Sequence, residues 1–408
     1  MPHLRKRHLS PRLATALKHS PIVGLFGHRQ VGKTTTLEGV SKNYLTFDSK
    51  HTRLEASEDP ETFLAKSLMT STPVAIDECQ LVPEVFPALK ESVRKNKAPG
   101  SFLLSGSVRF TSRKVIQESL TGRILSLELL PLTLSEISGA PLSDFLIWAS
   151  TLAEITESRA RSRIGDRRTQ SRRWRDIESY LARGGLPGIC FMREPQARKD
   201  AIASLLRTII ERDLPLVKRS LLSPTVLLEL ARLIAKNGWS PLNMQAIKSE
   251  TGVAHETQKK ILYAMESVFL LRTIMLEGDF KGPIHVFEDQ LEQRFLRQAP
   301  GPEDEEAAGL LFRNLRAQYL YRTGMDFTPF VYRTRGGAEV PLAFRSETGV
   351  VGFIPFLGSE PTLSNQRSAT SFLRRYDRSK VVFVSTHPHE PVCLDSRTMI
   401  ADLATVLY

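Results

Sequence analysis

The stretch LFGHRQVGKTTTLEGV, residues 25–40, constrains the fold of this chain more than any other feature. Gly27, Gly32, Lys33 and Thr34 satisfy the pattern G-x-x-x-x-G-K-[S/T], in which backbone N–H groups and a helix N-terminus surround a phosphate. The pattern requires a strand before it and a helix after it. The apolar run SPIVGLFG predicts the strand, and KTTTLEGVSKN predicts the helix. The sequence therefore predicts an α/β fold with a parallel sheet and a phosphate-binding loop.

The loop is expected to hold a nucleoside triphosphate with Mg²⁺. Lys33 would contact the β- and γ-phosphates, and the hydroxyl of Thr34 would bind Mg²⁺. Most of the other contacts would come from backbone N–H groups. The predicted nucleotide-binding residues are Gly27, His28, Arg29, Gln30, Val31, Gly32, Lys33, Thr34 and Thr35.

A second part of the site is predicted by TPVAIDECQ, an apolar run that ends in Asp77 and Glu78. Asp77 is expected to hold Mg²⁺, often through water, and Glu78 to orient the attacking water. Phosphoryl transfer depends mainly on positioning and charge stabilisation, so a carboxylate pair at a strand end suits it. The alternative is an ordinary turn or helix cap after a strand.

Two further polar residues are candidates for contact with the γ-phosphate. Ser105 ends the apolar part of GSFLLSGS, which predicts another strand, and its hydroxyl could touch the phosphate or the water. Arg123 precedes a further predicted strand and could reach the γ-phosphate within the chain or from a neighbouring subunit. The alternatives are a serine in a strand-to-loop turn and a solvated arginine.

Composition bounds the class of protein. The 408 residues suffice for two or three domains, and 41% hydrophobic and 25% charged residues are typical of a soluble globular protein. Lys and Arg outnumber Asp and Glu by 56 to 44, which favours a polyanion such as nucleic acid as a partner. No apolar run predicts a membrane span or a signal peptide. Three cysteines without a C-x-x-C pair predict no zinc site or disulfide framework, and we expect a cytoplasmic location.

Together these stretches resemble one family, the prokaryotic AAA-type ATPases of the archaeal-ATPase kind, which carry a C-terminal domain of unknown function. The matching phrases, in the family's order, are GHRQVGKTT, AIDECQLVPEVFPALKESV, GSFLLSGS, TGRILSLELLPLTLSEI, GGLPG and TIIERDL. The resemblance is strong over residues 1–217 and looser beyond. It implies ATP as the nucleotide. His28 stands where the family usually has proline, and Ser105 where threonine is usual, so that the hydroxyl is kept.

The resemblance implies a P-loop ATPase core over residues 1–139, with five parallel strands, and a helical lid over 140–217. Within the lid, SRARSRIGDRRTQSRRWRD, residues 158–176, is rich in arginine. Such a block is either a solvated insert or an arginine-rich nucleic-acid contact. In the second case the candidate contacts are Arg172 and Arg173, with Trp174 to stack on a base.

Residues 218–290 predict a winged-helix-like domain, since three helices with a glycine-containing turn precede a β-hairpin. The third predicted helix would expose Lys259 and Lys260. This face could bind DNA, or the domain could only pack against its neighbours.

Residues 291–408 are expected, from the resemblance, to form an α/β domain like a degenerate restriction endonuclease. Such a nuclease holds its metal with carboxylates and supports the attacking water with a lysine. Those four positions are occupied here by Arg313, Pro341, Ile354 and Phe356. Nuclease activity is therefore not expected.

The predicted function is Mg²⁺-dependent ATP hydrolysis coupled to conformational change and to binding of DNA or a protein partner. The alternative is a nucleotide-gated switch with negligible turnover. The predicted catalytic residues are Lys33, Glu78, Ser105 and Arg123, and the predicted metal ligands are Thr34 and Asp77.

Overall fold

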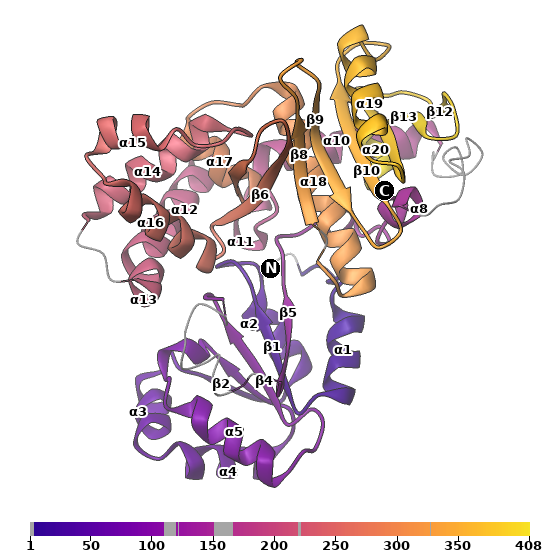
Figure 1. Ribbon diagram of the computed structural model, residues 1–408. Helices are drawn as coiled ribbons and strands as arrows, with labels where there is room; N and C mark the ends of the chain where they lie inside the picture. Colours follow the sequence, from indigo (N-terminus) through magenta and orange to yellow (C-terminus); the bar gives the residue numbers. More distant parts are fainter. Residues whose placement is uncertain (1–3, 110–119, 121, 151–165, 219–221, 327) are drawn as a thin grey trace.

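The computed structural model describes residues 4–109, 120, 122–150, 166–218, 222–326 and 328–408. Its N-terminal part is a five-stranded parallel sheet in the order β2-β3-β4-β1-β5 (Figure 1). The prediction of a parallel α/β fold is confirmed. The strands are β1 (Ile22–Phe26), β2 (Asn43–Thr46), β3 (Val74–Asp77), β4 (Phe102–Gly106) and β5 (Ile124–Glu128).

Helices cover both faces of this sheet, which explains why its central strands are apolar without alternation. Val23 and Leu25 of β1 are buried in one core cluster, and Ile22 in another on the opposite face. The first cluster includes Leu13 of α1 and the second Phe86 of α5. The helices of this part are α1 (Ser10–His19), α2 (Lys33–Val40), α3 (Lys50–Glu58), α4 (Pro60–Thr70) and α5 (Val85–Lys95).

A helical region follows, as predicted for the lid. Its elements are α7 (Leu134–Ser138), α8 (Phe145–Ser150), α10 (Arg167–Arg183), α11 (Pro187–Cys190), α12 (Pro195–Thr208), a π-helix η3 (Ile209–Asp213) and α13 (Leu214–Val217).

The part of the arginine-rich segment that the structure describes is the start of α10, whereas residues 158–165 lie outside the described residues. Asp166 caps this helix by accepting a hydrogen bond from the Thr169 N–H at 2.8 Å. Trp174 is partly buried against the core of the C-terminal part. The Arg173 guanidinium lies over the Tyr408 ring, 5.2 Å from its centroid. Because part of the Trp174 ring packs against this core, stacking of Trp174 on a base stays a prediction.

The middle segment contains the predicted three helices and hairpin, but the hairpin is not a free wing. Strand β6 pairs in parallel with β8, so that Met275 lies opposite Phe330. The predicted boundary at residue 290 therefore divides strands of one sheet. The pairing buries Ile274 and Leu276, which an isolated wing would expose. The elements are α14 (Pro224–Asn237), α15 (Met244–Thr251), α16 (His255–Ser267), β6 (Leu271–Gly278) and β7 (Gly282–Phe287).

The C-terminal part is a mixed eight-stranded sheet in the order β12-β13-β11-β10-β9-β8-β6-β7, with the long helix α18 packed on it (Figure 1). Most of α18 is buried, and its buried residues include both apolar side chains and the polar Arg313, Asn314, Arg316 and Gln318. The remaining elements are α17 (Gln290–Arg297), α18 (Glu303–Thr323), β8 (Thr328–Arg333), β9 (Glu339–Arg345), β10 (Val350–Phe356), α19 (Leu363–Arg375), β11 (Ser379–Ser385), β12 (Val392–Cys393), β13 (Thr398–Asp402) and α20 (Leu403–Leu407).

At three of the four positions compared with a nuclease site, the side chain is buried and takes part in packing or hydrogen bonding inside the protein. Arg313 is buried in α18 and donates hydrogen bonds to the carbonyls of Phe287 and Glu288. Ile354 and Phe356 of β10 are core residues. Among the described residues, no group of three or more His, Cys, Asp and Glu side chains could hold a metal ion. The absence of nuclease activity stays a prediction.

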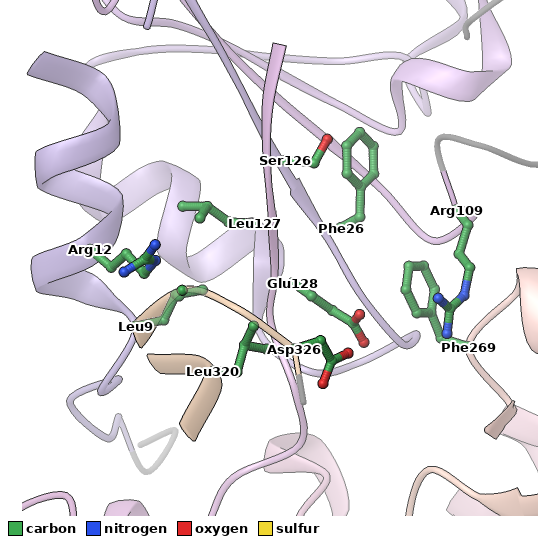
Figure 2. Close-up of a pocket in the computed structure, with 11 residues that line it drawn as sticks. Leu9, Arg12, Phe26, Arg109, Ser126, Leu127, Glu128, Phe269, Leu320 and Asp326 are labelled. Atoms are coloured by element: carbon green, nitrogen blue, oxygen red, sulfur yellow. The ribbon is translucent and has the colours of Figure 1, made fainter. Parts of the chain in front are cut away.

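Ion pairs join the two parts at a cavity of about 300 Å³. Figure 2 shows Glu128, at the end of β5, and Asp326, after α18, lining this cavity. Arg316 pairs with both carboxylates, at 3.2 Å each, and with Glu288 at 2.9 Å. Arg272 also pairs with Glu128.

Within the described residues, no helix is long and apolar enough to cross a membrane.

Candidate nucleotide-binding site

Three strands bring the predicted site residues together at the carboxyl edge of the N-terminal sheet. The loop 27–32 follows β1, and Asp77 ends β3. Strand β4 lies between them, with Ser105 opposite Leu25 of β1. The carboxyl ends of parallel strands meet at one edge, so residues far apart in the sequence converge there.

The loop turns back tightly over the end of β5. A Cβ atom on Gly27 would lie 2.2 Å from the Leu129 carbonyl oxygen, so only glycine fits there. The Lys33 ammonium donates to the carbonyls of Gly27 at 3.0 Å and His28 at 2.9 Å. Burial lowers the pKa of Lys33, although the carboxylates of the site oppose this. Within the described part of the chain, Lys33 is thus a buried cation whose hydrogen bonds go to backbone carbonyls.

Asp77 is the centre of a hydroxyl cluster. Its Oδ2 accepts hydrogen bonds from Thr34 Oγ1 at 2.6 Å and from the Tyr44 hydroxyl at 3.0 Å. Its Oδ1 accepts one from Ser105 Oγ at 2.7 Å. These contacts orient the carboxylate beside the hydroxyl of Thr34, as the predicted metal site requires. Tyr44 was not predicted, since β2 gives no sequence signal that its hydroxyl reaches the end of β3.

Glu78 has an unusual backbone conformation. Its φ of 53° is in the left-handed region, which non-glycine residues seldom adopt, and such strain is concentrated at functional sites. Gln80 donates a side-chain hydrogen bond to its carboxylate. Burial raises the pKa of Glu78, against the charge of Lys33. A carboxylate with a raised pKa is a better proton acceptor.

A cavity of about 960 Å³ lies over the loop, next to Lys33, Thr34 and Glu78. It falls in the range of about 300–1,000 Å³ typical of ligand sites, so its size fits a nucleotide. The lid contributes Phe191 and Met192 to its wall, and the segment 4–7 contributes to it beside them, with the Arg5 guanidinium 4.9 Å from the centroid of the Phe191 ring. Apolar and cationic side chains thus line the entrance.

Comparison with known protein families agrees with this geometry. Residues 19–138 match the model of a family described as "AAA domain". This part of the chain is an AAA-type P-loop ATPase domain. Residues 175–275 match a family described as a domain of unknown function (DUF8612).

The chain also has relatives among uncharacterised proteins. A protein of Mycobacterium tuberculosis and one of Mycobacterium bovis are each 33% identical to this chain over 184 residues, which is 44% of this chain. The match spans 40% of the length of each relative. It therefore says nothing about what the rest of those proteins does.

Solved structures of archaeal ATPases resemble the chain only distantly. The Walker-type ATPase PABY2304 of Pyrococcus abyssi has a TM-score of 0.42 and 14% identity, over 71% of this chain and 95% of its own. A STAND protein of Pyrococcus horikoshii has a TM-score of 0.29 and 14% identity, over 79% of this chain and 48% of its own. Neither likeness bears on what this chain does.

The lid also contacts the loop of the ATPase domain through residues that were not predicted. Both side-chain oxygens of Asp213 accept hydrogen bonds from Arg29, at 3.1 Å each. Its neighbour Arg212 pairs with Asp48, a residue of the cavity wall, at 2.6 Å. Both lie in the π-helix η3, and π-helical turns are frequent at functional sites. The phrase TIIERDL was noticed for its resemblance, but it indicated no contact with the loop.

Arg123 does not join this site. It directly precedes β5, which runs parallel to β1 and pairs Ile124 with Ile22. The loop follows the other end of β1, about five residues or roughly 16 Å away. The expectation that Arg123 acts within its own chain is therefore corrected. A role in a neighbouring subunit's site stays a prediction.

Lys259 and Lys260 lie on the exposed side of α16, as predicted. Lys259 pairs with Glu256 at 2.8 Å, and this acid reduces the positive charge of the face. A contact of these lysines with DNA stays a prediction.

Proposed function

We propose that this protein hydrolyses ATP at the cavity over the phosphate loop. The observation that carries the proposal is the convergence of Thr34 and Ser105 on Asp77, directly beside Glu78. The match of residues 19–138 to the AAA domain supports the reaction class. Lys33 is buried and, among the described residues, donates no hydrogen bond to a carboxylate, which suits a polyphosphate.

Each residue has one task in the proposed reaction. Thr34 Oγ1 and an oxygen of Asp77 would hold Mg²⁺, which neutralises charge on the phosphates. The Lys33 ammonium would move from the carbonyls of Gly27 and His28 to the phosphate oxygens. The Glu78 carboxylate would orient the attacking water and accept its proton. The single hydroxyl proton of Ser105 would either stay on Asp77 and keep it in place or be donated to the γ-phosphate or the water.

The test is steady-state phosphate release from the wild type and Glu78→Gln, each with and without duplex DNA. We expect Glu78→Gln to bind MgATP normally and to release phosphate at least about 100-fold more slowly. Equal turnover of the two proteins, with MgATP bound, would instead support the nucleotide-gated switch. An increase with DNA would support coupling to a nucleic-acid partner.

We further propose that the exposed face of α10 binds the phosphate backbone of nucleic acid. Arg168, Arg172 and Arg175 are all exposed and follow each other at the spacing i, i+4, i+7, which places them on one face. Asp176 of the same helix interacts with Arg172 and Arg175, but the arginines of α10 outnumber its acids, whereas Lys259 of α16 is paired one to one with Glu256. Three arginines on one side suit successive phosphates. The proposal thus favours α10 over α16 as the contact.

This surface is tested with a triple charge reversal, Arg168→Glu, Arg172→Glu and Arg175→Glu. The matched control reverses three exposed arginines of the C-terminal part, Arg374, Arg375 and Arg378. We expect the α10 variant to bind duplex DNA at least about tenfold more weakly, with a shallower salt dependence, and the control to change little. An equal loss in both would mean that only net charge matters. No loss in either would favour a protein partner.

A further inference from the structure

A buried ion pair connects the phosphate loop to the C-terminal part of the chain. His28 Nε2 lies 2.9 Å from Glu292 Oε1, and both side chains are fully buried. The other ring nitrogen of His28 lies 2.7 Å from the Arg29 carbonyl oxygen. Burial by itself lowers the pKa of His28. The charge of Glu292 and the other contacts of the ring together outweigh this effect, so the net pKa of His28 is raised. Nδ1–H therefore donates to the Arg29 carbonyl, while Nε2 and Glu292 lie at ion-pair distance without the geometry of a hydrogen bond.

His28 is also in contact with the lysine of the site. Its backbone carbonyl accepts the hydrogen bond from Lys33 at 2.9 Å. One residue of the loop therefore contacts Lys33 through its carbonyl and Glu292 through its ring. If Lys33 moves towards a phosphate, it gives up its hydrogen bond to the His28 carbonyl. The position of the loop then depends more strongly on the contact between His28 and Glu292.

The start of α17, which carries Glu292, is itself anchored to the lid. Asp289 Oδ2 accepts a hydrogen bond from the Gly185 N–H at 2.7 Å. A Cβ atom on Gly184 would lie 2.1 Å from Asp289 Oδ1, so this close approach needs glycine. The phrase GGLPG is thereby explained as a docking point for α17.

The same turn is anchored to the long helix of the C-terminal part. The Arg313 guanidinium of α18 donates to the carbonyls of Phe287 and Glu288 and to the side chain of Gln290. The segment 287–292 thus lies between three parts of the molecule: the phosphate loop, the lid and α18. Rigid, packed contacts of this kind can transmit a local change between sites.

We propose that Glu292 is a positioning residue for the phosphate loop, and that through His28 it couples nucleotide binding to the C-terminal sheet. The proposal rests on the proposed binding of a nucleotide at the loop. By linkage, the ion pair strengthens nucleotide binding by the same factor by which the nucleotide strengthens the ion pair.

The experiment measures the dissociation constant of MgADP by calorimetry for the wild type, Glu292→Gln, His28→Gln and the double variant. The matched control is Glu305→Gln. Glu305 is another largely buried glutamate, and its ion pair with Arg297, at 2.6 Å, does not touch the loop. We expect each variant of the ion pair to weaken MgADP binding about tenfold and the double variant to add little more, since the two residues act as one unit. The control should keep the wild-type constant.

A second readout follows amide hydrogen exchange over residues 27–35 without nucleotide. Exchange should become faster in Glu292→Gln and stay unchanged in Glu305→Gln, even when both variants lose the same amount of thermal stability. Additive effects of the two substitutions, or wild-type affinity in Glu292→Gln, would overturn the coupling while leaving the proposed function intact. If the wild type itself bound neither MgADP nor MgATP, the proposed function would fail first. Should Glu292→Gln not fold, His28→Gln removes the same ion pair, and the same affinity criterion applies.

Discussion

The two sheets of this molecule use buried charge in opposite ways. At the N-terminal sheet, burial lowers the pKa of Lys33 and raises that of Glu78. The buried environment therefore disfavours the charged form of each side chain. In the C-terminal part, Arg316 is equally buried, but Asp326 and Glu288 more than offset this burial and raise its pKa. The first region holds charges that its own fold leaves poorly compensated. Around Arg316, the second region more than compensates the buried charge.

This difference separates a candidate site from a structural joint. A fold keeps poorly compensated buried charges only at a cost, and such groups are concentrated where a ligand supplies the missing partner. Arg316 instead joins the two parts, since it pairs with Glu128 of β5 as well as with Glu288. The comparison therefore predicts opposite effects of substitution in the two regions.

The largest expected effect is on stability, in the C-terminal region. Arg316→Met removes one partner from three carboxylates, and breaking a buried ion pair in this way costs about 3–5 kcal/mol. Chemical denaturation should report this loss in the free energy of unfolding, while the folded variant keeps the wild-type affinity for MgATP. A stability loss below about 1 kcal/mol would mean that Arg316 is not the joint inferred here.

Lys33→Met should show the converse. The variant loses a charge-assisted contact to the phosphates, so its affinity for MgATP should fall on the order of 100-fold. Its free energy of unfolding should not fall, because burial already disfavours the ammonium. Calorimetry and denaturation on the same preparation test both statements. Undiminished MgATP binding by Lys33→Met would also remove the basis of the proposed function.

Asp289 sharpens the comparison through pH. Burial, together with the charge of Glu292, raises the pKa of Asp289 to about 6. Between about pH 4 and 6 the native state keeps a proton that the unfolded state has lost, so stability falls as pH rises through this window. Asp289→Asn removes this titration but also one of two hydrogen-bond acceptors, so the variant should be less stable at pH 4 and the difference from the wild type should shrink by up to about 2 kcal/mol by pH 6. If the difference in free energy of unfolding between Asp289→Asn and the wild type stayed constant from pH 4 to 6, the raised pKa of Asp289 would be contradicted.

The smallest expected effect concerns two serines at strand ends. Ser105 of β4 donates to Asp77, whereas Ser385 of β11 accepts from the backbone N–H of His387. Losing one hydrogen bond is worth about 1 kcal/mol, so Ser105→Ala should slow phosphate release several-fold. Ser385→Ala should leave the rate unchanged. If both variants had the wild-type rate, Ser105 would be structural like its counterpart.

The features that could be predicted from the sequence are local ones. The loop, its strand and its helix are contiguous, and their backbone geometry depends on residues a few positions apart. Asp77 and Ser105 could be placed because each directly ends an apolar strand, and parallel strands end at a common edge. The parallel sheet and the helices of the middle segment follow from the same short-range periodicity.

Tertiary structure alone decided the contacts between distant segments. Nothing in the residue spacing pairs His28 with Glu292 or Arg29 with Asp213, since these contacts depend on how the lid and α17 pack. Arg123 is a different case: it directly precedes β5, and in a parallel sheet this position lies at the amino edge, away from the phosphate loop, so its proposed role within its own chain was wrong. The hairpin β6–β7 joined the C-terminal sheet through another contact between distant segments. The free N–H and C=O groups of a strand edge can pair with any strand that the fold brings beside them. That partner can be distant in the sequence, as β8 is from β6, so the residues of the hairpin alone do not specify it.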